Sequence, residues 1–268
     1  MNSRNPCKLT AFGGFGYINQ PYYSACELLF VEKFNGIFVL ANIRGGGEFG
    51  EEWHKYGSDI HRSTAIDDMI AAAEYLIQRK YTNSDNLILQ GNENGGLIAA
   101  ACANKRPDLF KAVILDNPLT DMLRYYKYSS TGRWMNEYGN LYHQEVFNAL
   151  YSYSPIHNVP NSSIINKLHY PAILILSDLQ SSNVEYVHSL KLLATLQNEL
   201  NNNNNNNNNT DSLPQSYIIL GWLKNDSQNK IDKVTTICSF LQIILSLHWS
   251  TKQENEANYP RKLVICSK

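Results

Sequence analysis

Residues 87–105 read Leu-Ile-Leu-Gln-Gly-Asn-Glu-Asn-Gly-Gly-Leu-Ile-Ala-Ala-Ala-Cys-Ala-Asn-Lys, and this stretch decides the fold. The apolar run Leu87–Gln90 predicts a buried strand, and the alanine-rich run Gly95–Lys105 predicts a helix. The glycines between them favour a tight turn that lifts one side chain above the sheet. That raised side chain is Glu93.

The same alternation of strand and helix continues along the chain. Several apolar runs lack a polar alternation, which is typical of central strands covered on both faces. Such an alternation predicts an α/β fold with a mostly parallel sheet and helices on both sides. The expected strands are Leu9–Phe12, Ile37–Asn42, Leu87–Gln90, Ala112–Asp116, Ala172–Ser177 and Tyr217–Leu220, and the expected helices are Ile66–Ile77, Gly95–Lys105, Tyr186–Leu200 and Lys230–His248.

Composition narrows the class of protein. The 268 residues, 43% hydrophobic, are enough for one buried core, which we assign to residues 1–250. A net charge of −1 without basic clusters argues against nucleic acid, and no apolar stretch is long enough for a membrane span. The first residues carry no signal peptide pattern, and the five cysteines form no CxxC pair. We therefore expect a cytoplasmic protein with reduced thiols, no metal and no cofactor.

Two segments fall outside the alternation. Asn201–Asn209 is a run of nine asparagines, which offers no apolar surface to offset its ordering entropy. We expect a disordered loop there, with an interaction or aggregation role as the less favoured alternative. Residues 251–268 form a polar tail whose place in the fold the sequence leaves uncertain.

The turn at Glu93 is the candidate site of chemistry. A strand, a turn flanked by Gly91 and Gly95, and a helix are the setting of the nucleophile elbow G-x-S-x-G, here with glutamate in place of serine. On its own, this pattern is explained better by a plain strand-to-helix turn than by a site of chemistry.

Further motifs occur in a consistent order around the elbow, and together they closely resemble the prolyl oligopeptidase family from about Leu9 to Trp249. The resemblance implies an α/β-hydrolase fold with a Ser–Asp–His triad that cleaves short peptides after proline. The motifs are Gly13-Gly14-Phe15, the run 41–50 (ANIRGGGEFG), Trp53-His54-Lys55, the run 73–77 (AEYLI), Asn94-Gly95-Gly96-Leu97, the run 106–110 (RPDLF), Asp121-Met122-Leu123, Tyr138-Gly139, Tyr153-Ser154-Pro155 and His188-Ser189-Leu190-Lys191.

Carried over position by position, the resemblance implies that all three triad residues are replaced. The serine position is Glu93, and the acid position is Ser181, although a shifted alignment would make Asp178 the acid. The arginine that holds substrate becomes Asn183. The histidine position is Trp222, to within about one residue, which we expect in a turn after the last predicted strand.

The resemblance also implies what is left of the substrate site. The tyrosine that donates to the oxyanion is Phe12, so only a backbone donor near Asn94 remains for that role. Phe15, Trp134 and Tyr138 match the aromatic residues that line the proline-binding pocket. These rings have about equal claim to be plain core residues.

We therefore expect an inactive relative of a serine peptidase, because a serine nucleophile needs a base and the base needs an orienting acid. A Glu93 nucleophile would still need a histidine beside the elbow, and none of the seven histidines follows Leu220 in the expected turn. Weak binding of proline-containing peptides is the retained function that we expect. The alternatives are an active serine-type oligopeptidase or other hydrolase, and a partner-binding module or decayed gene product.

The resemblance begins near Met1, at the third strand of the family's sheet. It implies that the family's first strands and its β-propeller are missing here, through real truncation or an incomplete gene model. We therefore expect an open sheet edge, and a homologous chain that covers it is one candidate partner.

Overall fold

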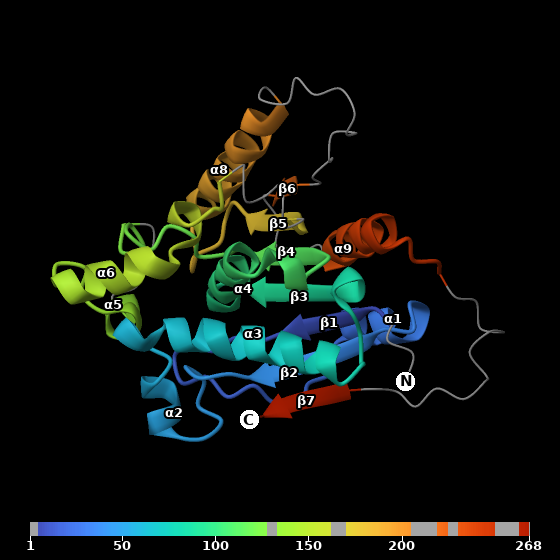
Figure 1. Ribbon diagram of the computed structural model, residues 1–268, viewed down its shortest axis with the longest axis horizontal. Coiled ribbons are helices and arrows are strands. Elements are labelled where there is room, and N and C mark those ends of the chain that lie inside the picture. Colours follow the sequence, from blue (N-terminus) through green and yellow to red (C-terminus); the bar gives the residue numbers. More distant parts are fainter. Residues whose placement is uncertain are drawn as a thin grey trace.

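Seven strands form one sheet, and the described pairings between them are all parallel. The order across the sheet is β6-β5-β4-β3-β1-β2-β7 (Figure 1). The structure, a computed structural model, describes residues 5–127, 133–161, 170–204, 219–224, 230–249 and 263–267. The strands are β1 (Cys7–Thr10), β2 (Ile37–Asn42), β3 (Leu87–Asn92), β4 (Ala112–Asp116), β5 (Ala172–Asp178), β6 (Ile219–Lys224) and β7 (Leu263–Ser267).

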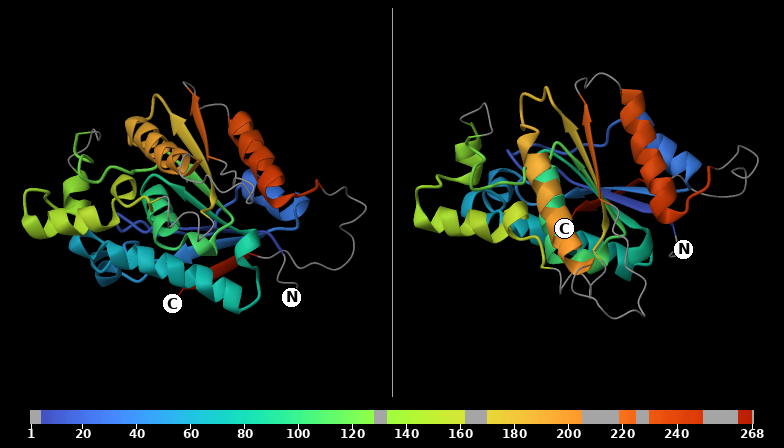
Figure 2. Two further views of the ribbon diagram at one scale, coloured as in Figure 1. Left: turned by 45° about the horizontal axis from the view of Figure 1, so that its top comes forward. Right: turned by 90° about the horizontal axis from the view of Figure 1, so that it is seen from above.

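Helices cover both faces of this sheet (Figure 2). Buried side chains of α3, α4 and α8 belong to the core on one face, and those of α1 and α9 to the core on the other. The predicted α/β architecture is thus confirmed. The helices are α1 (Ala25–Lys33), α2 (Glu51–Lys55), α3 (Ser63–Gln78), α4 (Asn94–Lys105), α5 (Arg133–Tyr138), α6 (Gln144–Tyr153), α8 (Val187–Asn204) and α9 (Lys230–Leu245).

The central strands are buried on both sides, which explains their continuous apolar runs. In β4, Val113 and Leu115 face the core under α3 and α4, whereas Ala112 and Ile114 face the core under α1 and α9. Because successive side chains of a strand point to opposite faces, a polar residue in the middle of β4 would have no exposed position.

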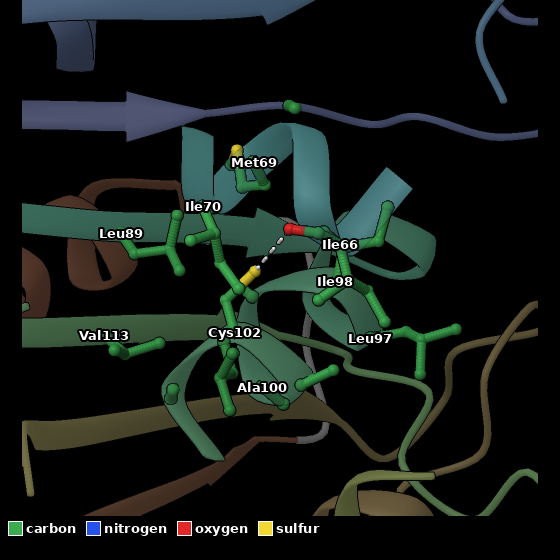
Figure 3. Packing of buried hydrophobic residues seen from close by; sticks show 14 of the residues in the cluster. Ile66, Met69, Ile70, Leu89, Leu97, Ile98, Ala100, Cys102 and Val113 are labelled. Atoms are coloured by element: carbon green, nitrogen blue, oxygen red, sulfur yellow. Dashed lines mark hydrogen bonds between the residues drawn. The ribbon is translucent and has the colours of Figure 1, made fainter. Parts of the chain in front are cut away.

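Helix α4 lies between the sheet and α3, and its residues 94–103 are all buried. Figure 3 shows Ile66, Met69 and Ile70 of α3 gathered beside Cys102 of α4, whose Sγ lies 3.6 Å from the carbonyl oxygen of Ile66. Since both sides of α4 are packed, the start of this helix is held firmly at the end of β3. The turn that carries Glu93 is positioned by that packing.

Most predicted elements are present, with two displaced strands. β2 and β4 have the expected bounds, whereas β1 begins and ends two residues before the predicted strand. The strand expected at Tyr217–Leu220 is instead β6, Ile219–Lys224. The expectation that Trp222 lies in a turn after this strand is therefore wrong, because Trp222 pairs with Leu176 inside the sheet.

The uncertain C-terminal tail contributes an edge strand. β7 lies along β2 in parallel, with Phe38 opposite Leu263 and Asn42 opposite Ser267. The open edge that we expect therefore does not lie beside β2, and β7 is itself the edge strand on this side of the described sheet. Backbone groups of β2 that would otherwise lack partners are paired by β7.

The asparagine run does not begin as a loop. Helix α8 continues to Asn204, so its first four asparagines are helical, and the remainder of the run lies outside the described residues. None of the helices in the described part is long and apolar enough to cross a membrane. The four cysteines whose side chains are described form no disulfide.

Candidate active site

The turn between β3 and α4 has the sharp geometry of a nucleophile elbow, with Glu93 at its apex. Glu93 has a φ of +48° and a ψ of −107°, a conformation that side-chain-bearing residues rarely adopt. A Cβ at Gly91 would collide with the carbonyl group of Gly95, and one at Gly95 would collide with the carbonyl oxygen of Ala11. Only glycine fits at these two positions, so the predicted turn is present.

The carboxylate of Glu93 is partly exposed and is held by an amide. Its Oε1 accepts a hydrogen bond of 3.0 Å from Nδ2 of Asn183. No lysine, arginine or histidine in the described part of the chain pairs with it. The structure thus brings together Glu93 and Asn183, the residues that we match to the family's serine and arginine positions.

The loop after β5 carries Ser181, the residue at the matched acid position. The Oγ of Ser181 accepts a hydrogen bond of 3.4 Å from the backbone N–H of Val184. Asp178, the alternative acid, ends β5, and its Oδ1 accepts from the backbone N–H of Gln180 at 2.9 Å. Both side chains therefore bond to the backbone of their own loop, and neither contacts an imidazole of the described residues.

Trp222 faces away from the elbow turn. It lies in β6 and packs against the core cluster under α1 and α9. Residues 225–229, which follow β6 in the sequence, are outside the described residues and contain no histidine.

The matched oxyanion positions lie side by side. Nδ2 of Asn94 donates to the carbonyl oxygen of Phe12, and Oδ1 of Asn94 accepts from the hydroxyl group of Tyr138 at 2.7 Å. The Phe12 ring packs edge-on against that of Tyr17, with 5.5 Å between ring centroids. The side chain of Phe12 offers no hydrogen-bond donor, so Phe12 cannot stabilise an oxyanion through its side chain.

Phe15, Trp134 and Tyr138 form one aromatic cluster beside these residues. The ring centroid of Phe15 lies 6.4 Å from that of Trp134 and 5.8 Å from that of Tyr138, and Trp134 and Tyr138 are 5.9 Å apart. Their exposure differs, since Tyr138 is buried, Trp134 is partly exposed and Phe15 is 39% exposed. The expected aromatic set is thus assembled, and part of it is open to solvent.

A buried charged network supports this cluster. Arg62 is fully buried, pairs with Glu137 and donates to the carbonyl oxygen of Gly13 at 2.6 Å. Glu137 also accepts from the backbone N–H of Phe15 at 2.8 Å and contacts Nε2 of His54 at 2.8 Å. Nothing in the local sequence marks Arg62 as buried, and only its pairing with a carboxylate 75 positions away explains its place.

In the described residues, no group of three or more His, Cys, Asp or Glu side chains could hold a metal ion. The polar groups at the elbow are instead one carboxylate, two amides and a tyrosine hydroxyl. Such a set can bind and orient a ligand through hydrogen bonds and charge.

Comparison with known proteins agrees with this geometry. The sequence model of the prolyl oligopeptidase family matches residues 21–243. A prolyl endopeptidase of Dictyostelium discoideum is 42% identical over 195 residues, which are 73% of this chain and 25% of that protein. The dual function macrocyclase-peptidase POPB of Amanita bisporigera is 32% identical over 252 residues, which are 92% of this chain and 33% of that protein.

A solved structure shows the same fold. Prolyl oligopeptidase B from Galerina marginata, without ligand, matches with a TM-score of 0.80 and 30% identity, over 92% of this chain and 33% of that chain. This chain therefore spans about a quarter to a third of the length of these relatives. With a matching family model, a matching fold and a preserved elbow turn, the chain belongs to the prolyl oligopeptidase family.

Proposed function

We propose that this chain keeps the fold of a prolyl oligopeptidase peptidase domain without its peptidase activity, and that it binds short proline-containing peptides weakly. The observation that carries the proposal is the state of the elbow, where Glu93 stands in place of the nucleophile and is held by Asn183. A carboxylate bonded to a neutral amide has neither the hydroxyl group nor the neighbouring base that acyl transfer from serine requires.

No imidazole in the described part of the chain bonds to the Glu93 carboxylate. His54 contacts Glu137 at 2.8 Å, and Nδ1 of His157 contacts Oγ of Ser154 at 2.7 Å. His188 is fully buried on the far side of the loop that follows β4. His169 lies outside the described residues. A carboxylate nucleophile would need an imidazole to activate water, and no described histidine supports that role.

Peptide binding is supported by the aromatic cluster of Phe15, Trp134 and Tyr138. Aromatic faces and edges give apolar contact to a pyrrolidine ring with little polar demand. Because part of Phe15 and Trp134 is exposed, a short peptide can reach these rings.

A fluorophosphonate probe and a fluorogenic proline-containing peptide test the loss of activity. We expect no labelling and no turnover for the chain as it stands. Because loss of the nucleophile or the base of a comparable triad lowers turnover by about 10⁶-fold, any residual rate would fall below detection. An active prolyl endopeptidase is the positive control.

The variant Glu93→Ser makes this test sharper. It restores a hydroxyl group at the elbow but no base, so we expect it to remain unlabelled as well. Labelling of Glu93→Ser would mean that a base is present, and labelling or turnover by the unchanged chain would refute the proposal.

A further inference from the structure

Glu93 carries a negative charge that no residue in the described structure neutralises. Its Oε1 is bonded to the amide of Asn183, and no described side chain bonds to its Oε2. Glu93 precedes the twelve-residue helix α4, whose N-terminal dipole favours an anion at this end. The carboxylate is also partly exposed, so a ligand from solvent can reach it.

The buried cation beside the aromatic cluster does not balance this charge. Arg62 lies 4.9 Å from the centroid of the Tyr138 ring, but it is already paired with Glu137. Arg62 and Glu137 together carry no net charge, so the site as a whole keeps the charge of Glu93. A positively charged ligand would neutralise the Glu93 carboxylate.

The aromatic cluster is joined to the elbow by a hydrogen bond. Tyr138 is bonded through its hydroxyl group to Asn94, the residue that follows Glu93. Burial is the main cause that raises the pKa of Tyr138 well above its ordinary value, and the Glu93 carboxylate adds to the effect. The hydrogen bond to Asn94 therefore places the Tyr138 hydroxyl group beside the residue that follows Glu93, and Phe15 and Trp134 contact the Tyr138 ring.

We propose that Glu93 and the aromatic cluster of Phe15, Trp134 and Tyr138 form a binding site for an organic ammonium group. The nitrogen takes the open oxygen of Glu93, and its attached carbons lie against the rings, where cation–π attraction adds to apolar contact.

An amino-terminal proline fits this chemistry. Its protonated nitrogen and its apolar carbons share one small ring, so ion pair and aromatic contact form together. An internal proline has no charge and would place a peptide carbonyl oxygen near the carboxylate, which disfavours it. This choice of ligand rests on the proposed function, since it assumes that the rings accept proline.

Calorimetric titration with two dipeptide amides tests the site. Prolyl-alaninamide and N-acetyl-prolyl-alaninamide differ chiefly in the charge on the proline nitrogen, and at about pH 6.5 the free amine is protonated. We expect the free amine to bind about tenfold more tightly, because a partly exposed ion pair and a cation–π contact together contribute an effect of that order. Alanyl-alaninamide, which has an ammonium group without the ring, separates a general amine site from one that prefers proline.

Two variants and a control variant test whether Glu93 and the aromatic cluster cause the preference for the free amine. Glu93→Gln keeps the shape of the side chain and should reduce the preference for the free amine to less than about twofold. Trp134→Ala should weaken both proline peptides. Glu145→Gln, which removes an exposed carboxylate on α6, should leave both affinities unchanged.

The outcomes separate this inference from the proposed function. Equal binding of the two proline peptides would overturn the ammonium site and leave proline binding intact. A preference that survives in Glu93→Gln would also overturn it. Equal binding of prolyl- and alanyl-alaninamide, both dependent on Glu93, would support the ammonium site and refute proline binding. If the unchanged chain binds none of the three peptides, both proposals fail.

Discussion

Acid should destabilise this domain through one buried histidine, His188 in α8. Its side chain is 0% exposed, and its Nδ1 accepts hydrogen bonds from the backbone N–H groups of Thr120, at 3.3 Å, and Asp121, at 3.0 Å. Burial lowers the pKa of His188 from 6.5 to about 4; Asp121 opposes this shift, and Lys191 adds to it with a smaller effect. Protonation of Nδ1 would remove its acceptor role and break both hydrogen bonds.

The size and sign of the effect follow from linkage. Because the folded pKa is lower than the unfolded pKa, the unfolded state binds the proton more readily, and the contribution to stability is lost as the pH falls from 6.5 towards 4. The free energy of unfolding should therefore fall by about 2 kcal/mol between pH 7 and pH 5, and by about 3 kcal/mol by pH 4. His157, whose pKa is lowered mainly by burial, adds a loss of the same sign.

Urea denaturation followed by circular dichroism at several pH values measures this slope. His188→Gln offers an amide oxygen as acceptor and does not titrate, so its curve should be flatter by about 2 kcal/mol between pH 7 and pH 5, whatever its absolute stability. His143→Gln, at an exposed position, is the matched control and should keep the full slope. If the variant is too unstable, NMR titration of the unchanged chain gives the pKa of His188 directly. An equal slope in His188→Gln, or a folded pKa near 6.5, would refute the reasoning.

Three further predictions concern stability. Gly91→Ala should lower the free energy of unfolding by about 2–3 kcal/mol in urea denaturation, because its Cβ would meet the Gly95 carbonyl group; an unchanged midpoint would contradict the tight turn. Arg62→Met leaves the buried Glu137 without the guanidinium it pairs with, so the free energy of unfolding should fall by about 3–5 kcal/mol in the same assay. The double variant Arg62→Met/Glu137→Leu should recover much of that stability. An equal loss in the single and the double variant would show that the unpaired carboxylate is not the cause. Removal of residues 263–267 should expose β2 and raise light scattering on concentration, and a clear monomeric solution would argue against the role of β7.

Sequence alone predicts the inner sheet well, because burial on both faces demands unbroken apolar runs. Ile37–Asn42 and Ala112–Asp116 have no polar side chain before their last residue, so the sequence alone predicts where these strands begin and end. The elbow is readable for a similar reason, since the close backbone contacts at Gly91 and Gly95 admit no other residue.

The misplaced parts depend on partners that are distant in the sequence. Gly221 and Trp222 resemble a turn until their pairing with β5 is known, and the tail could not be assigned because the partner of β7 is β2. Arginine is usually a surface residue, and Arg62 is buried because the fold brings Glu137 next to it. The matching of Glu93, Ser181 and Trp222 to triad positions stays a prediction.

The position of β7 in the chain has a consequence for biosynthesis. β2 leaves the ribosome more than 200 residues before β7, its neighbour in the sheet, with Phe38 opposite Leu263. At about 5–20 residues per second, the nascent chain would hold that side of β2 unpaired for on the order of 10 to 45 seconds. During that interval the unpaired side of β2 can pair wrongly with strands of other nascent chains on the same polysome. We therefore expect chaperone binding to the nascent chain to be important, although β2 is paired on both sides in the folded sheet.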